Sequence, residues 1–324
     1  MRVARVLLGS AFAAVVVATA PPLFACDSTG CLMLTRGPGG VLRKGGWNFE
    51  LSYRYADQSK PLSGRDATDF VSRPRVDLER GRLISNYHRD IDGVDRGFQA
   101  EAAYGVAPST TLYVSAPVLS LKSHEIGHAA VVTEYDTWGF GDAVVGARQA
   151  ISLPFAGSGM AGLGLKLPTG KTSLIDSFDN LPLDPVLQPG TGSLDVLFTG
   201  QYSRSFESPR LDVSLSASYQ ANTTNDKSYR FGNEAIAALG LSRPLGKSFS
   251  LSAQTKWMRE GRDRFRGLDV PSTGSTFVYV TTGIRFFHGA FSYYAVAQVP
   301  VYRYVNEAQL APTAGLVAGI SRSF

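Results

Sequence analysis

The sequence predicts an all-β protein: a transmembrane antiparallel β-barrel of the outer-membrane type, with about twelve strands. Three observations predict it. Apolar and polar residues alternate over many segments, these segments are about twelve residues long, and short and long connections alternate between them. The composition agrees, because 44% apolar and 18% charged residues in 324 are what an apolar outer face and a polar inner face average to. Beyond the N-terminus, no run of about twenty apolar residues predicts a membrane helix.

Residues 1–25 are expected to be a cleaved secretory signal peptide. Arg2 and Arg5 precede an unbroken run of small and apolar residues over 6–20, and Ala25 is a small residue at the expected cleavage site. Cleavage removes two of the 32 basic residues and none of the 27 acidic ones, so the formal net charge becomes +3. Because these charges are mixed along the chain, we expect no nucleic-acid partner.

Residues 26–45 are expected to be a periplasmic N-terminal segment or a partial plug, followed by the barrel over 46–324. This segment holds Cys26 and Cys31, and in an exported chain two thiols five positions apart can close a disulfide ring. The alternative is a lipoprotein, because Leu-Phe-Ala before Cys26 resembles a lipobox. Mass spectrometry of the mature N-terminus distinguishes the two, since acylation consumes the Cys26 thiol.

The barrel segments follow a period of two residues. Over 47–55 every odd position is aromatic or leucine and every even position is polar, so one face meets an apolar medium and the other meets water. Residues 98–104, 211–220 and 249–257 show the same pattern. The predicted strands cover residues 46–57, 94–106, 110–121, 139–152, 159–167, 191–204, 210–221, 232–243, 248–259, 275–287, 290–304 and 312–324.

The connections favour a membrane barrel over a β-sandwich or a soluble barrel, which alternation alone allows. Tight turns are predicted at 107–109, 153–158, 205–209, 244–247 and 288–289. Longer polar loops are predicted near 58–93, 122–138, 168–190, 222–231, 260–274 and 305–311. Outer-membrane barrels have short periplasmic turns, long outside loops and an even strand number. Strands of about twelve residues, at roughly 3.3 Å each and tilted near 40°, span about 30 Å, which is enough for the apolar band.

Aromatic residues mark the expected membrane interfaces. Trp47 opens the first strand, Trp138 precedes the fourth and Trp257 nearly closes the ninth. The last strand alternates and ends in Phe324, which resembles the signal for barrel assembly, and only Arg322 departs from it. We therefore expect the outer membrane of a Gram-negative bacterium as the location, and its lipid and barrel-assembly machinery as partners. The sequence sets no oligomeric state.

Three stretches carry a family resemblance. They are GFGD at 139–142, LPTGK at 167–171 and LQPGTGSLD at 187–195. Together they resemble the outer-membrane transporters of the phenol-degradation meta-pathway family, which is distantly similar to the fatty acid and toluene channels of Gram-negative bacteria. The resemblance covers about residues 94–324 and implies a barrel that takes up small apolar or aromatic compounds. Those channels have about fourteen strands and a folded plug, whereas this sequence predicts twelve strands and some twenty residues before them.

The sequence HEIGH at 124–128 matches the zinc-protease pattern of two histidines and a glutamate base. That chemistry needs a helix, on which positions i and i+4 share one face. Here the motif follows a strand pattern over 110–121, so we expect a loop in which His124 and His128 bind a metal at most opportunistically. Elemental analysis of the purified protein tests this.

A second polar cluster precedes the second predicted strand and consists of His88, Asp90, Asp92 and Asp95. Carboxylates at this spacing suit calcium in a loop. The full calcium-loop pattern is absent, however, and neighbouring arginines can neutralise the acids, so a solvated loop is the better interpretation of the sequence.

Charged residues at the polar positions of the strands are expected to line the lumen. The candidates are Glu50, Arg54, Glu101, Asp142, Arg148, Lys166, Asp195, Asp212, Glu234 and Lys256. They can form a solute path, or equally a network of ion pairs that only holds the shape of the wall. Twelve strands enclose more room than the eight whose side chains fill the interior, so we expect a narrow or occluded channel.

The function expected from the sequence is passive passage of a small solute, of apolar or aromatic class, through an outer-membrane barrel. We expect no catalytic residues, no enzyme activity and no cofactor. The first alternative is a non-conducting structural or binding barrel that scaffolds a periplasmic or surface partner. The remote alternative is a metal-dependent hydrolase that uses His124, Glu125 and His128.

Overall fold

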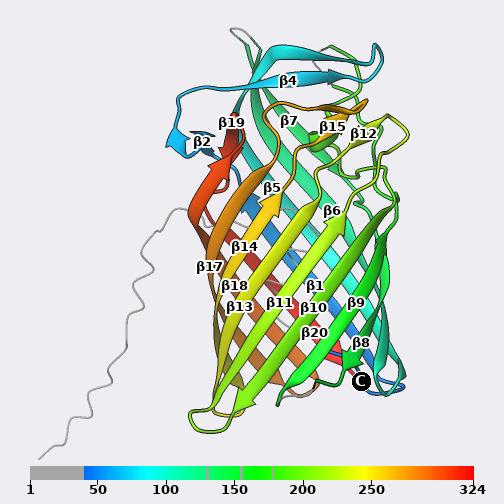
Figure 1. Cartoon of the computed structure of the whole chain (residues 1–324), viewed down its shortest axis with the longest axis vertical. Coiled ribbons are helices and arrows are strands. Elements are labelled where there is room, and N and C mark those ends of the chain that lie inside the picture. Colours follow the sequence, from blue (N-terminus) through cyan, green and yellow to red (C-terminus); the bar gives the residue numbers. More distant parts are fainter. Residues whose placement is uncertain (1–39, 129–130, 154–155, 177–178) are drawn as a thin grey trace, which may run out of the picture.

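The computed structural model of the chain describes residues 40–128, 131–153, 156–176 and 179–324. Within these ranges twelve antiparallel strands close into a barrel (Figure 1), which confirms the predicted fold class. The barrel strands are β1 (Trp47–Asp57), β5 (Arg82–Ala107), β6 (Thr110–His128), β8 (Val144–Ile151), β9 (Ser158–Lys166), β10 (Asp195–Phe206), β11 (Leu211–Ala221), β13 (Glu234–Leu245), β14 (Phe249–Glu260), β17 (Ser275–His288), β18 (Phe291–Val305) and β20 (Gly315–Ser323). The ring closes where β1 pairs with β20.

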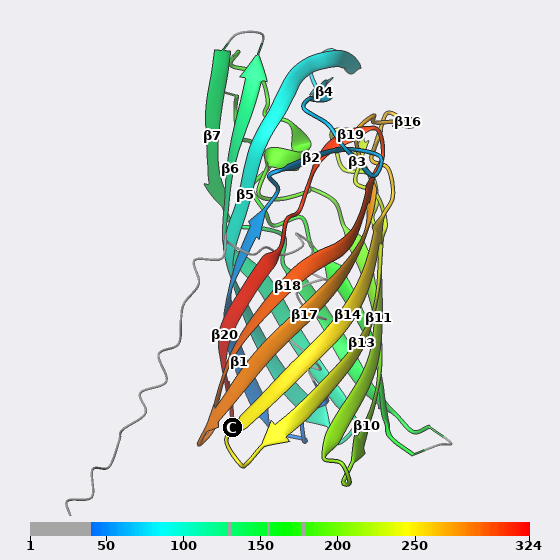
Figure 2. The same cartoon turned by 90° about the vertical axis from the view of Figure 1, so that its left-hand side faces the viewer.

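The two ends of the barrel differ as the sequence predicts. Short connections join β5 to β6, β8 to β9, β10 to β11, β13 to β14 and β17 to β18. These connections, the start of β1 and the C-terminus all lie at the lower end in Figures 1 and 2. We call this the periplasmic end, because outer-membrane barrels keep their short turns there, and the opposite end the outer end.

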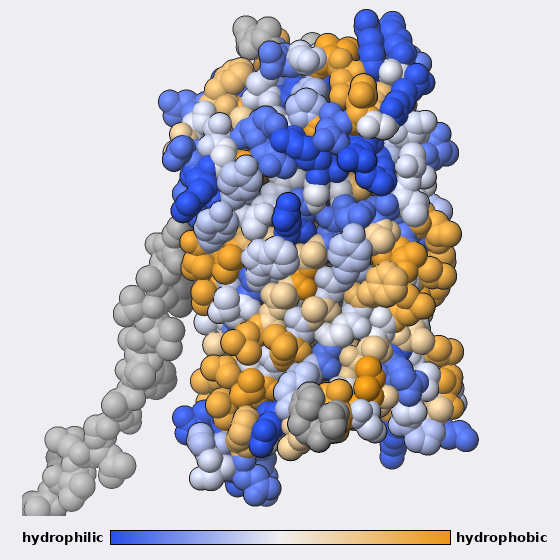
Figure 3. Space-filling view, in the orientation of Figure 1, coloured by the Kyte–Doolittle hydropathy of each residue, from blue (hydrophilic) through white to orange (hydrophobic). Residues whose placement is uncertain are grey.

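The outer wall is apolar because the alternating residues of each strand face away from the lumen. On β14, Leu251 and Trp257 are exposed on the outer face, whereas Lys256, the residue before Trp257, is fully buried on the inner face. Hydrophobic residues gather over the lower part of the molecule and hydrophilic ones over the upper part (Figure 3). An apolar band below a polar outer end is the pattern of a membrane-spanning barrel.

The aromatic residues expected at the interfaces are all exposed: Trp47 and Trp257 on barrel strands and Phe324 at the end of the last one, whereas Trp138 lies outside the twelve barrel strands. Arg322, the residue that departs from the last strand's pattern, lies over the rings of Phe324 at 4.2 Å and Phe291 at 5.0 Å. Attraction between a cation and the face of an aromatic ring explains how an arginine is accommodated at this rim.

Two of the expected outer loops are largely strand, which corrects the sequence prediction for 58–93 and 122–138. Strands β5 and β6 continue above the barrel, and β4 (Val71–Asp77) and β7 (Val131–Gly139) pair with their outer parts. The four strands rise above the wall as one sheet (Figure 2). Leu183 and Leu187, in the connection between β9 and β10, are buried against this sheet, and Leu187 ends a short helix, η1 (Pro185–Leu187).

Bulges explain why alternation did not predict this sheet. Phe98 pairs with Leu119 but Gln99 pairs with Pro117, so Val118 is an extra residue and the inward positions of β6 change from odd to even. A second bulge in β5 leaves Ile91 unpaired. Above the membrane the sheet also needs no apolar outer face, so apolar and polar residues no longer alternate along its strands.

Small strands complete the outer end. They are β2 (Lys60–Ser63), β3 (Asp66–Ala67), β12 (Tyr229–Arg230), β15 (Arg264–Phe265), β16 (Leu268–Asp269) and β19 (Ala308–Ala311). Tyr229 and Phe265 pack with Val76 of β4 into a buried apolar cluster over the mouth. In the described part of the chain, no helix is long and apolar enough to cross a membrane. The signal peptide, Cys26, Cys31 and all but the end of segment 26–45 lie outside the described residues.

Candidate functional site in the lumen

The charged residues expected in the lumen lie on the inner face of the barrel or of its outer mouth. Glu101, Asp142, Arg148, Lys166, Asp195, Glu234 and Lys256 are buried, and Glu50, Arg54 and Asp212 are partly buried at inward positions. Two pairs are in direct contact: Arg148 and Glu101 at 2.9 Å, and Lys166 and Asp195 at 2.5 Å. Charges this buried are stable only with such partners.

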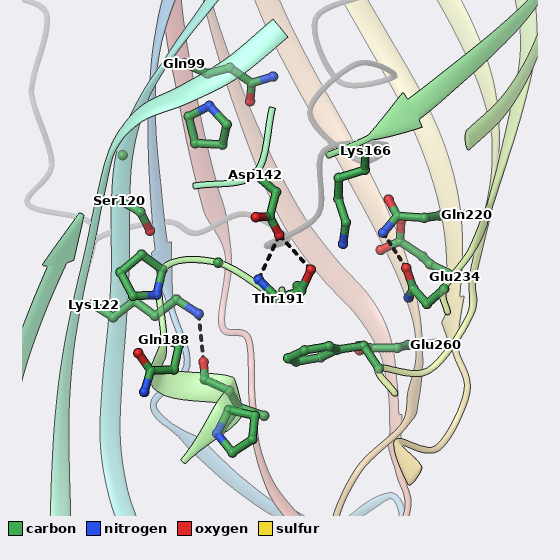
Figure 4. A pocket seen from close by; sticks show the side chains of 18 of the residues that line it. Gln99, Ser120, Lys122, Asp142, Lys166, Gln188, Thr191, Gln220, Glu234 and Glu260 are labelled. Atoms are coloured by element: carbon green, nitrogen blue, oxygen red, sulfur yellow. Dashed lines mark hydrogen bonds between the residues drawn. The ribbon is translucent and has the colours of Figure 1, made fainter. Parts of the chain in front are cut away.

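An outer cavity of about 250 Å³ opens between the barrel and the connection from β9 to β10. Lys122 lies on one side, where its Nζ donates to the carbonyl of Val186 at 2.7 Å. Glu234 and Glu260 lie on the other side (Figure 4). β6 and β14 are six strands apart in the ring, so Lys122 and Glu260 lie on opposite sides of the cavity.

The three stretches that carry the family resemblance meet at this cavity, around the carboxylate of Asp142. Its Oδ2 accepts bonds from the backbone N and the Oγ1 of Thr191, at 2.7 and 2.6 Å, and its Oδ1 accepts one from the N of Gly170 at 2.8 Å (Figure 4). Gly170 also lies against Gly190 so closely that a Cβ on Gly170 would come within 2.6 Å of the Gly190 Cα. We call this arrangement the Asp142 knot.

The Asp142 knot explains the glycines of these stretches and the late start of two strands. Glycine is required at positions 170 and 190 because the two backbones touch there. This contact explains why the stretches that carry the family resemblance are rich in glycine. β8 and β10 begin later than predicted, at Val144 and Asp195, because the residues before them take part in the knot or its surroundings.

An inner cavity of about 320 Å³ lies toward the periplasmic end. Residues 40–42, the first that the structure describes, line it together with Glu50, Arg148 and Arg285. The backbone N of Leu42 donates to Thr111 Oγ1 at 2.7 Å, and the side chain packs against a buried cluster that includes Tyr113. The end of segment 26–45 therefore lies inside the lumen.

Four buried residues on the inner face of three neighbouring strands, β14, β17 and β18, form a cluster that we call the waist. They are Lys256, Tyr279, Thr281 and Gln298, and none of them lines either cavity. Lys256 donates to Gln298 Oε1 at 2.6 Å and lies 4.9 Å from the centre of the Tyr279 ring. All four side chains are at least 97% buried, and Lys256 lies on β14 between Gln254, which lines the inner cavity, and Met258, which lines the outer one.

The waist also holds polar atoms that are not satisfied by the protein. The Oη of Tyr279, the Oγ1 of Thr281 and the Nε2 of Gln298 are buried and have no hydrogen-bond partner among the described residues. Thr281 and Gln298 are directly opposite each other on β17 and β18. Buried polar atoms in this state are costly unless water or a solute bonds to them.

Tyrosine rings and cations alternate along the lumen. Besides Lys256 over Tyr279, Arg148 lies 4.2 Å from the Tyr113 ring and Arg285 lies 4.9 Å from the Tyr294 ring. The sequence interpretation missed these tyrosines because it counted only inward charges. The signal was present, since Tyr113 and Tyr279 occupy inward positions between residues that face outward.

The HEIGH motif lies in β6, which corrects the expectation of a loop. On a strand, residues four apart are separated by roughly 13 Å, so the two imidazoles cannot reach one zinc ion as they do on a helix. His124 instead bonds to Asp95 at 3.2 Å, and His128 is buried beside His88, with ring centres 5.9 Å apart.

The acidic cluster lies in β5 of the protruding sheet. Asp90 contacts His88 at 3.3 Å and Arg73 at 3.2 Å, and Asp92 bonds to the next backbone N at 2.7 Å. Among the described residues, no three histidine, cysteine, aspartate or glutamate side chains are grouped so that they could hold a metal ion. The expectation of a solvated loop is therefore wrong, because the cluster is part of a strand, and Arg73 of the neighbouring strand β4 pairs with Asp90 instead of an arginine adjacent in sequence.

With this geometry established, comparison with known proteins identifies the family. The sequence profile of the family described as "Putative MetA-pathway of phenol degradation" matches residues 97–289, more than half of the chain and all three stretches of the knot. The chain belongs to this family. The family's resemblance seen in the sequence is thereby confirmed. No curated protein matches the chain.

Solved structures agree on the fold. An outer membrane channel from Pseudomonas putida F1 is similar with a TM-score of 0.58 and 15% identity, over 89% of this chain and 99% of that one. A FadL homologue from Pseudomonas aeruginosa has a TM-score of 0.41 and 10% identity, over 94% and 99% of the two chains. The monoaromatic hydrocarbon channel CymD has a TM-score of 0.41 and 12% identity, over 93% of each. The similarity to the Pseudomonas putida channel shows that the chain has the fold of an outer-membrane barrel.

Proposed function

We propose that the protein is a passive channel of the Gram-negative outer membrane for small aromatic solutes of the phenol class, and that it is not an enzyme. The observation that carries this proposal is the waist. A cavity that charged residues help to line lies on each side of it, and the waist itself holds a cation, an aromatic ring and unsatisfied polar atoms close together.

The chemistry of the waist suits a phenol. Lys256 can lie over the face of an aromatic solute as it lies over Tyr279. Thr281 and Gln298, which are directly opposite, can bond to a hydroxyl that a hydrocarbon lacks. Tyrosine is itself a substituted phenol, so a solute that displaces the Tyr279 ring would take over contacts that already exist.

The waist must rearrange for passage, because its residues are buried and the cavities are separate. The Tyr279 ring can move by a rotamer change without disturbing the strand ladder. In this proposal the driving force is the solute's own concentration gradient. The description of the family, which names phenol degradation, supports the same class of solute.

Planar-bilayer recordings test the proposal. The purified full chain is expected to give a small conductance that phenol reduces reversibly and cyclohexanol, a non-aromatic alcohol of the same size, does not. Lys256→Met should weaken the effect of phenol by about tenfold, because the cation over the ring is lost. A chain that carries no current, with or without residues 26–45, would instead support the scaffold alternative.

A further inference from the structure

Four arginines line a hollow of about 440 Å³ at the outer rim of the barrel, which adjoins the outer cavity at Glu260. They are Arg230 of β12, Arg259 of β14, Arg262 after β14 and Arg264 of β15. Among the described residues that line the hollow, the acids are Glu260 and Asp269. β12 and β15 lie beside each other at the outer end (Figure 1). The hollow therefore carries an excess of positive charge.

Two of the arginines are held in place by acids. Arg262 forms a two-pronged ion pair with Glu307, with distances of 2.8 and 2.5 Å. The Nε of Arg264 lies 2.9 Å from Asp269 Oδ1. Each of these pairs uses part of a guanidinium group, which has five N–H donors, and fixes the orientation of the rest.

Arg230 and Arg259 have no acidic side chain as a partner among the described residues. Within the part of the chain that the structure describes, neither Arg230 nor Arg259 has an ion pair or a side-chain hydrogen bond. Arg230 is moreover directly opposite Arg264 in the ladder between β12 and β15. Like charges opposite each other on a sheet destabilise it. An anion that lies between the guanidinium groups removes this repulsion, and phosphate oxygens suit their planar, forked donors.

The level of the hollow along the barrel axis indicates which anion it can meet. Arg259 follows Trp257 by two residues on the outward face of β14, and Tyr304 lines the hollow. Tryptophan and tyrosine on the outer wall mark the level of the lipid headgroups. The outward side of the hollow, at Arg259 and Tyr304, thus lies at the level of the outer-leaflet headgroups.

We propose that this hollow binds the phosphate of a lipid in the outer leaflet, with Arg230 and Arg259 as its principal contacts. The two arginines orient the phosphate, and Trp257 and Tyr304 contact the start of the acyl chains. The inference rests on the outer-membrane placement in the proposed function but not on conduction, so the two can fail independently.

Native mass spectrometry of the full chain in detergent tests the site. Diphosphorylated lipid A is titrated against the protein, with its dephosphorylated form and inorganic phosphate as separate probes. We expect the phosphorylated lipid to remain bound and the other two to be lost. In Arg230→Gln/Arg259→Gln its apparent affinity should fall about tenfold or more, since charge-assisted hydrogen bonds are lost.

The matched control is Arg243→Gln, an exposed arginine near the periplasmic end of β13, which should bind the lipid as the unchanged protein does. Equal binding of the dephosphorylated lipid, or an unchanged affinity in the double variant, would overturn the proposal. Retention of inorganic phosphate as tightly as the lipid would also overturn it and identify a site for free anions. If the double variant does not fold, each single variant gives the same comparison.

Discussion

Lys166 and Asp195 lie directly opposite each other on β9 and β10, and the lysine Nζ is 2.5 Å from the aspartate Oδ2. Asp195 is fully buried and also accepts bonds from Ser193 Oγ at 3.0 Å and from the backbone N of Thr223 at 2.7 Å. One carboxylate therefore joins a cation of the lumen to two connections at the outer end.

Asp195→Asn is expected to lower the free energy of unfolding by about 3 to 5 kcal/mol, because the buried ammonium of Lys166 loses its counter-ion. Urea unfolding in lipid vesicles, followed by tryptophan fluorescence, measures this. Asp212→Asn is the control, since Asp212 is on the inner face of a neighbouring strand but only partly buried; its effect should stay below about 1 kcal/mol. Equal effects would show that the ion pair contributes nothing particular.

Asp142→Ala is expected to release the connection between β9 and β10, since three hydrogen bonds to one carboxylate are lost. Limited proteolysis within residues 167–194 should become at least about tenfold faster while the barrel stays intact. Asp136→Ala, which removes an exposed aspartate of β7 bonded only to Ser123 in the described residues, is the comparison and should leave cleavage unchanged. Unchanged cleavage in Asp142→Ala would contradict the knot's role.

The protruding sheet is expected to loosen in acid. Burial and the nearby His88 lower the pKa of His128 below its ordinary value of 6.5. Because the folded state favours the neutral ring, its contribution to stability is complete above about pH 6.5 and is lost as the pH falls through the lowered pKa. Hydrogen exchange of residues 120–139 should therefore accelerate between pH 7.5 and 5, and less so in His128→Gln. An equal acceleration in that variant would assign the effect to other groups.

Purified protein equilibrated with zinc and then desalted is expected to retain no stoichiometric metal. The reason is geometric, since His124 bonds to Asp95 and points from a different level of β6 than His128. Elemental analysis measures the zinc content. One zinc per chain that is lost in His124→Ala would revive the metal-dependent alternative.

Much of the fold is predictable from the sequence because one physical rule, apolar outside and polar inside, acts on every membrane strand. The rule does not hold above the membrane. There the bulge at Val118 shifts the alternation and no lipid requires an apolar face, so a period of two residues does not reveal the outer part of β6 or β7. In the lumen the rule finds the charged residues but not the waist, because the contact of Lys256 with Tyr279 depends on register between β14 and β17. The Asp142 knot depends likewise on residues far apart in the chain.

The waist is the part of the lumen that we propose controls the passage of a small aromatic solute. Single-channel recording of Tyr279→Ala beside the unchanged protein tests it most directly, with Tyr293→Ala, an exposed tyrosine of the outer wall, as the control. The account predicts that Tyr279→Ala raises the conductance at least about twofold and abolishes the reversible reduction by phenol. Tyr293→Ala should change neither. A conductance and a phenol response that are the same in all three proteins would contradict the account.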